Sequence, residues 1–151
     1  MASNLNTILD KVVTALELIN GAGVYTYDVS DGQSVIFGAE VYPARAPRIN
    51  IFEISVATDF DAPLSEYRRL INLQLVGYVA AANDTPESKV KAANNLLNDI
   101  MRALEADAQL SSTIIDLDVD ARTFDGLEFG LNSMGIVYAQ VELRYHQDTG
   151  I

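Results

Sequence analysis

The chain has 151 residues, near the commonest size of one domain, and 49% of them are hydrophobic, enough for one substantial core. Its 10 Lys and Arg stand against 21 Asp and Glu, a formal net charge of -11, which excludes broad electrostatic attraction to nucleic acid or anionic lipid. The absence of cysteine excludes disulfides, thiolate metal sites and cysteine nucleophiles.

The sequence indicates one soluble domain over residues 1–151. No apolar run reaches the roughly 20 residues that a membrane-spanning helix needs. The first residues also lack the basic start and continuous apolar stretch of a secretory signal. We therefore expect an intracellular product that has no membrane partner, with its acidic residues concentrated in the C-terminal third.

The N-terminal part is predicted to be a helix followed by a strand. Apolar residues recur at 3.6-residue spacing over Leu5–Ile19, after potential capping side chains at residues 3–4. The glycines of residues 20–23 end this helix. Residues 24–29 are rich in β-branched and aromatic side chains, which favours a strand, and residues 30–33 have the composition of a turn.

Residues 30–48 are expected to form a loop or arm. Two prolines and the basic residues Arg45 and Arg48 fall within Tyr42–Arg48, and prolines interrupt regular structure. Two interpretations stay open for this segment: a solvated loop and a loop that binds a partner.

Two strands and a second helix follow. Ile49–Thr58 reads as a strand, and Tyr67–Ala81 as a long central strand with apolar residues on both faces for part of its length. Residues 85–87 supply a capping hydroxyl, a proline at the first helical position and an acid in the first turn. The helix that they open is predicted to end near Ala106.

Between Ile114 and Ala121, acidic and aliphatic residues alternate strictly from Ile115 onward, which predicts a half-buried strand with its acids on one face. We call these acids the acidic row: Asp116, Asp118 and Asp120. A calcium loop of the EF-hand type begun at the first acid needs glycine at its sixth position and glutamate at its twelfth. Those positions hold Ala121 and Leu127, so we interpret the row as a charged strand face without a metal.

The last predicted element, Gly135–His146, alternates cleanly between apolar and polar residues, with one face in the core and the other wet or at an interface. Helices and strands do not alternate regularly along the chain. That order favours an α+β fold in which two main helices flank a mostly antiparallel sheet.

The sequence offers no catalytic constellation. Its only histidine, His146, falls on the polar face of the final strand, and neither a phosphate-binding loop nor a dinucleotide-binding glycine motif is present. Lys89 and Lys91 are predicted on the exposed part of the second helix. A pair of carboxylates meeting in a cleft stays open, but no pair is singled out. We expect no cofactor, no metal and no enzymatic activity.

Three segments together resemble the tail-terminator, or tail-completion, proteins of long-tailed bacteriophages: Leu5–Leu16, Ala92–Asp107 and Gly135–Tyr145. The resemblance covers nearly the whole chain in element order and size. It implies a homo-hexameric ring that sits on the last ring of tail-tube protein, stops tube growth and docks head-completion or neck proteins. In contractile tails the ring would also contact sheath protein. DNA would pass through the lumen without specific binding, and the ring would belong to the virion tail after assembly in the host cytoplasm.

Within this resemblance the acidic row is a candidate for the lumen wall or for a seam between subunits, facing Arg122 or Arg144 of a neighbour. An acidic lumen repels the phosphate backbone, so DNA slides without sticking. The segment with Arg45 and Arg48 would be an arm towards an adjoining ring. Two alternatives stay open: another neck or tube-completion subunit of the virion, and a small-molecule-binding α+β domain or enzyme.

Overall fold

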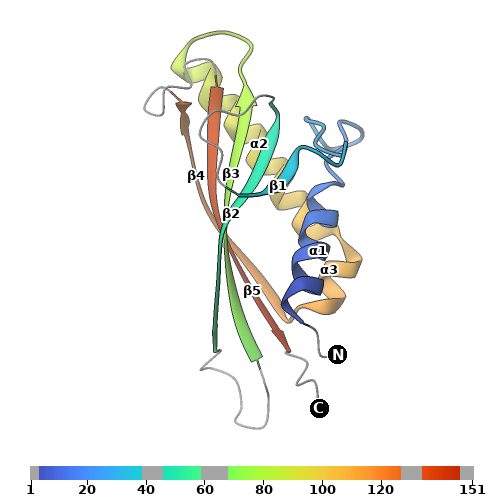
Figure 1. Ribbon diagram of the computed structural model, residues 1–151. Coiled ribbons are helices and arrows are strands. Elements are labelled where there is room, and N and C mark those ends of the chain that lie inside the picture. Colours follow the sequence, from blue (N-terminus) through green and yellow to red (C-terminus); the bar gives the residue numbers. More distant parts are fainter. Residues whose placement is uncertain (1–3, 39–45, 59–67, 127–133, 147–151) are drawn as a thin grey trace.

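The computed structural model describes residues 4–38, 46–58, 68–126 and 134–146 (Figure 1). The elements are, in chain order, α1 (Leu5–Leu16), β1 (Val35–Phe37), β2 (Arg48–Thr58), β3 (Arg68–Ala80), α2 (Pro86–Ala106), α3 (Ala108–Thr113), β4 (Asp116–Asp125) and β5 (Met134–His146). The described strands form one sheet in the order β1-β2-β3-β5-β4. Within this sheet of described strands, β1 and β2 are the only parallel neighbours. The predicted α+β fold, with a mostly antiparallel sheet and two main helices, is confirmed.

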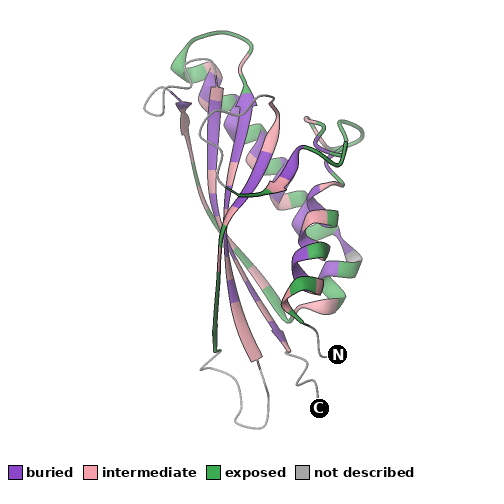
Figure 2. Cartoon of the chain, in the orientation of Figure 1, coloured by how far each residue is buried: buried purple, intermediate pink, exposed green. Residues whose placement is uncertain are grey.

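All three described helices lie on one side of the sheet, and the core fills the space between them and the strands (Figures 1 and 2). α2 packs across β3, β5 and β4, while α1 packs on α2, α3 and β1. Alternate residues of β3 and β5 are buried under this helix layer. The largest contributions come from Ile71, Leu73, Leu75, Val137, Val141, Leu143 and Tyr145.

Capping side chains set the helix starts. The side-chain oxygen of Asn4 accepts a hydrogen bond from the Thr7 amide at 2.9 Å, and the Thr85 hydroxyl accepts one from the Ser88 amide at 3.2 Å. Both caps satisfy amides that have no partner within the helix. Asp107 does the same for α3, a short helix that was not expected, by accepting from the amides of residues 109 and 110 at 2.8 and 3.2 Å.

The strand predicted over residues 24–29 is wrong. This segment forms no strand and contributes only an isolated bridge between Asn20 and Asp28. The buried carboxylate of Asp99, on α2, accepts hydrogen bonds from the amides of Thr26 and Tyr27 at 2.9 to 3.1 Å. Those amides are therefore satisfied by a side chain, and the segment lies against α2 instead of joining the sheet.

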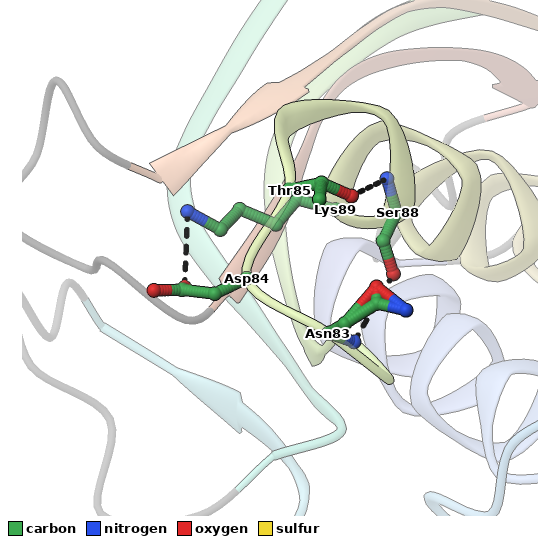
Figure 3. A network of polar contacts seen from close by, with 5 residues as sticks. All are labelled: Asn83, Asp84, Thr85, Ser88 and Lys89. Carbon is green, nitrogen blue, oxygen red and sulfur yellow. Dashed lines mark hydrogen bonds and ion pairs between the residues drawn. The ribbon is translucent and has the colours of Figure 1, made fainter.

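The prediction that Lys89 is exposed is also wrong. Its side chain is buried, whereas that of Lys91 is exposed as expected. Figure 3 shows the Lys89 ammonium reaching Asp84, with Nζ and Oδ1 separated by 3.4 Å. The aliphatic stem of a lysine packs on apolar surface while its charged end reaches a partner, which explains a buried lysine on the sheet side of α2.

The strand β2 carries a β-bulge. Its register with β3 runs regularly to Ile51, shifts by one residue, and resumes at Glu53. Phe52 is therefore the extra residue. A bulge bends the strand and increases its local twist.

Two glycines allow α2 to lie very close to the sheet. A Cβ atom at Gly135 would be 2.1 Å from the carbonyl oxygen of Lys89, and one at Gly77 would be 2.8 Å from Cδ2 of Leu96. The first neighbour is helix backbone, and the second is the end of a flexible side chain. A side chain at position 135 would therefore press on the helix backbone, whereas one at position 77 could be accommodated by movement of the Leu96 side chain.

We expect Gly135→Ala to lower the free energy of unfolding by about 1–3 kcal/mol, because the added methyl group overpacks the contact with α2. Gly77→Ala is the matched control: the same change on the adjacent strand should cost less, since Leu96 can change rotamer. Urea unfolding of both variants measures the difference. Equal losses would contradict a backbone contact at Gly135.

Candidate functional site

The sheet face that carries none of the described helices is the candidate functional surface, and we call it the helix-free face (Figure 1). Strand register and burial identify its residues, because side chains alternate between the two faces. From β4 to β2 they include Asp116, Asp118, Asp120, Arg122, Phe124, Ile136, Tyr138, Gln140, Glu142, Arg144, Leu70, Asn72, Gln74, Val76, Tyr78, Asn50, Phe52, Ser55 and Ala57.

The acidic row has the predicted geometry. Asp116, Asp118 and Asp120 are exposed on the helix-free face, while Leu117 and Val119 are partly buried against the core on the opposite face. β4 is the last strand in the sheet order, so the row lies on an edge strand. The strand alternation proposed from the sequence is thus confirmed.

The register with β5 places one acid against another. Asp118 lies directly opposite Glu142, whereas Asp120 faces Gln140 and Asp116 faces Arg144. Like charges at directly opposite positions of two strands destabilise a sheet. The β4–β5 part of the helix-free face therefore carries a concentration of negative charge, and this repulsion opposes folding of the subunit.

Arg144 belongs to the same chain as the acid it contacts. Its Nη1 lies 3.1 Å from Oδ1 of Asp116, an ion pair between two partly exposed side chains. The sequence-based hypothesis that Arg122 or Arg144 of a neighbouring subunit faces the row stays a prediction. Arg144 of the same chain neutralises one end of the row and leaves Asp118 and Asp120 to define the acidic surface.

Arg122 is engaged by an aromatic ring. Its guanidinium carbon lies 5.2 Å from the centroid of the Tyr138 ring, within the range of a cation–π interaction. Tyr138 also packs against Phe52, with ring centroids 6.0 Å apart, and its hydroxyl donates to Oε1 of Gln74. These four residues form a belt across β4, β5, β3 and β2.

The belt divides the helix-free face into two parts. A small apolar cluster lies on one side of the belt, towards the C-terminal end of β4. In this cluster Tyr78 and Ile136 are buried, and three further side chains pack against them: Val76, Phe124 and Met134. On the other side lie the acidic row and Glu142. One face therefore offers an apolar end and an acidic end.

The predicted loop over residues 30–48 is only partly correct. Val35–Phe37 forms β1, and Arg48 is the first residue of β2, where it lies opposite Tyr78. A three-residue strand is too short to produce a recognisable alternation in the sequence. Arg48 is partly buried and has partners within the protein, and Arg45 lies outside the described residues.

In the described ranges, no group of three or more His, Cys, Asp or Glu side chains could hold a metal ion. Acids two residues apart on a strand are separated by about 6.6 Å along it. Ca²⁺ needs its ligands at about 2.3–2.6 Å, so an extended row of this kind does not converge on one ion. His146 is half-buried at the end of β5 and already has an interaction partner.

A surface pocket of about 710 Å³ lies beside the start of α2. Its charged lining residues Glu87 and Lys91 form an ion pair with each other at 2.7 Å. The hydroxyl of Tyr27 donates to the carbonyl of Ala92 at 3.3 Å, and burial raises the pKa of this tyrosine. These polar groups are occupied by one another, so the pocket presents no converging set of reactive side chains.

Comparison with protein-family models and with curated proteins finds no match for this chain. Among the described helices, none is long and apolar enough to cross a membrane.

We expect Asp118→Asn to raise the free energy of unfolding by about 0.2–1 kcal/mol, because it removes the repulsion from Glu142. Asp116→Asn is the matched control on the same strand face. It should leave stability unchanged or lower it by up to about 1 kcal/mol, since it loses the exposed ion pair with Arg144. Urea unfolding at low and high salt measures both effects, which salt should reduce. A loss of stability in Asp118→Asn would refute the like-charge contact.

Proposed function

We propose that this chain is a structural virion protein that forms a hexameric ring at the end of a bacteriophage tail tube. The ring stops elongation of the tube and provides the interface to head-completion or neck proteins, with sheath as a further partner in contractile tails. The proposal rests on the resemblance of three segments to tail-terminator proteins. The observation that supports it best is the acidic surface on the helix-free face.

The position of this acidity suits a wall beside passing DNA. Asp118, Asp120 and Glu142 gather on one sheet face, and the chain as a whole carries a net charge of -11. Screening at physiological salt limits such repulsion to about 8 Å. An acidic wall therefore prevents the phosphate backbone from adhering while leaving the middle of a wider channel open.

The cost of the like-charge pair supports a functional origin for this surface. Asp118 opposite Glu142 weakens the isolated subunit, and an asparagine or glutamine at either position would keep the strand geometry without that repulsion. Features that oppose folding are expected where function requires them. Repulsion of DNA is a function that requires negative charge and no catalytic group.

Termination follows from the geometry of a ring with two different faces. A face that matches the end of the tube binds there, and the opposite face does not match another tube subunit, so polymerisation stops. Subunits related by rotation make the same head-to-tail contact repeatedly, and six contacts close the ring. The exposed opposite face is then available for head and neck proteins.

We expect phage particles assembled without this protein to contain overlong tails that lack heads. Electron microscopy of lysates from an amber mutant, with and without expression of the protein in trans, measures tail length and head attachment. Tails of normal length that lack heads would indicate the alternative, another neck subunit. Normal particles with heads would contradict a role in the tail altogether.

We expect the triple variant Asp116→Asn, Asp118→Asn, Asp120→Asn to support tails of normal length but to slow genome delivery, because DNA adheres to a less acidic wall. The control removes three charges from the helix layer: Asp10→Asn, Glu17→Gln and Glu105→Gln. Potassium efflux and DNA ejection rates compare the two variants. Equal rates in both would argue against repulsion by the acidic row.

A further inference from the structure

Two edges of the sheet are left open by the described strands. Among the described residues, β1 pairs with β2 only at Ile49–Ile51, so the Glu53–Thr58 segment of β2 has a described strand neighbour on one side only. β4 pairs only with β5 and ends the sheet on the other side. Open edges present rows of backbone N–H and C=O groups that can pair with another strand.

The open segment of β2 lacks the usual protection of an edge strand. Glu53–Thr58 contains one charged residue, no lysine and no proline. Residues 55–58 are exposed, and the large side chain of Val56 is 43% exposed. A charge-poor segment rich in β-branched residues is a strong candidate for pairing with a further strand.

The charges indicate which strand completes this edge. Two copies of β4 side by side would bring their acidic rows together, which is unfavourable. The β2 segment instead carries a single acid, Glu53, on the helix-free face beside the neutral Ser55 and Ala57, and it presents Ile54 and Val56 on the helix side. The latter would extend the apolar surface formed on β4 by Leu117 and Val119.

We propose that the Glu53–Thr58 edge of β2 pairs with β4 of a second copy of this chain, so that the sheet continues from subunit to subunit. This contact rests on the proposed ring and specifies its interface. Along the sheet β2, β3, β5 and β4 alternate in direction, so β4 runs opposite to β2. If the ring axis runs along the strands, the rotation that relates neighbouring subunits leaves the strand directions unchanged. The β2 edge of one subunit and β4 of the next therefore pair antiparallel.

The helix layer indicates which face would line the lumen of such a ring. The described helices form an extra layer on one face only (Figure 1). When a sheet curves into a ring, the outer layer has the larger circumference, so the helices fit on the outside. The helix-free face, with Asp118 and Asp120, then faces inwards.

The test changes the charge of Ser55, which is exposed on the open edge. In Ser55→Lys the new ammonium would lie beside the acidic row of the neighbour, so the protein concentration at which half of the chains are assembled should fall by about 2- to 5-fold. In Ser55→Asp the new carboxylate would be repelled by that row, and the same concentration should rise by a similar factor. Sedimentation velocity over a concentration series measures assembly, and circular dichroism checks folding. Ser112→Lys and Ser112→Asp, at an exposed site on α3, are the matched controls and should leave assembly unchanged.

A second variant makes the partner explicit. Asp118→Lys with Asp120→Lys should restore the assembly of Ser55→Asp, because opposite charges again meet across the contact. Weakening by both Ser55 variants would instead indicate that β2 pairs with β2 and would overturn the proposal. Rings that form regardless of the charge at Ser55 would overturn the edge contact and leave the proposed function standing. A chain that stays monomeric at every concentration would refute both.

Discussion

The close contact between α2 and the sheet is the constraint on which the rest of the structure depends. At Gly135 the helix backbone lies so near β5 that a methyl group would not fit, and Gly77 and Ala93 keep neighbouring positions small. This contact brings α2 across β3, β5 and β4 and concentrates the core on that side. The alternation of each strand then places its polar residues on the opposite face, where the acidic row and Glu142 meet.

Elements with strong local signals were predictable from the sequence. α1 and α2 have capping residues and apolar periodicity, and β4 and β5 alternate regularly, so their positions agree with the structure to within a few residues. The strand predicted over residues 24–29 is wrong because the strand propensity of these residues is overridden by hydrogen bonds to Asp99, whose carboxylate is more than 70 residues away in the chain. Competition of this kind depends on tertiary contacts and leaves no local trace in the sequence.

The sequence predicted the acidic row of the candidate site but not the residues of other strands that lie beside it. The acidic row is visible in the sequence because its three acids are two residues apart. Its opposing residue Glu142 and its ion-pair partner Arg144 are set by strand register, which the alternation of two separate strands does not determine. The belt around Tyr138 likewise joins four strands that are distant in sequence.

The bulge at Phe52 has a consequence for the shape of the subunit. It shifts the phase of β2, so Ile49 and Ile51 point to the core before it and Ile54 does so after it; without the extra residue, Glu53 would point there instead. The bulge also coincides with the end of pairing to β1. The first half of β2 is therefore held between β1 and β3, whereas the second half pairs with β3 alone. A change in the bend at the bulge would alter the direction of the second half and, with it, the curvature of any larger sheet to which the subunit contributes.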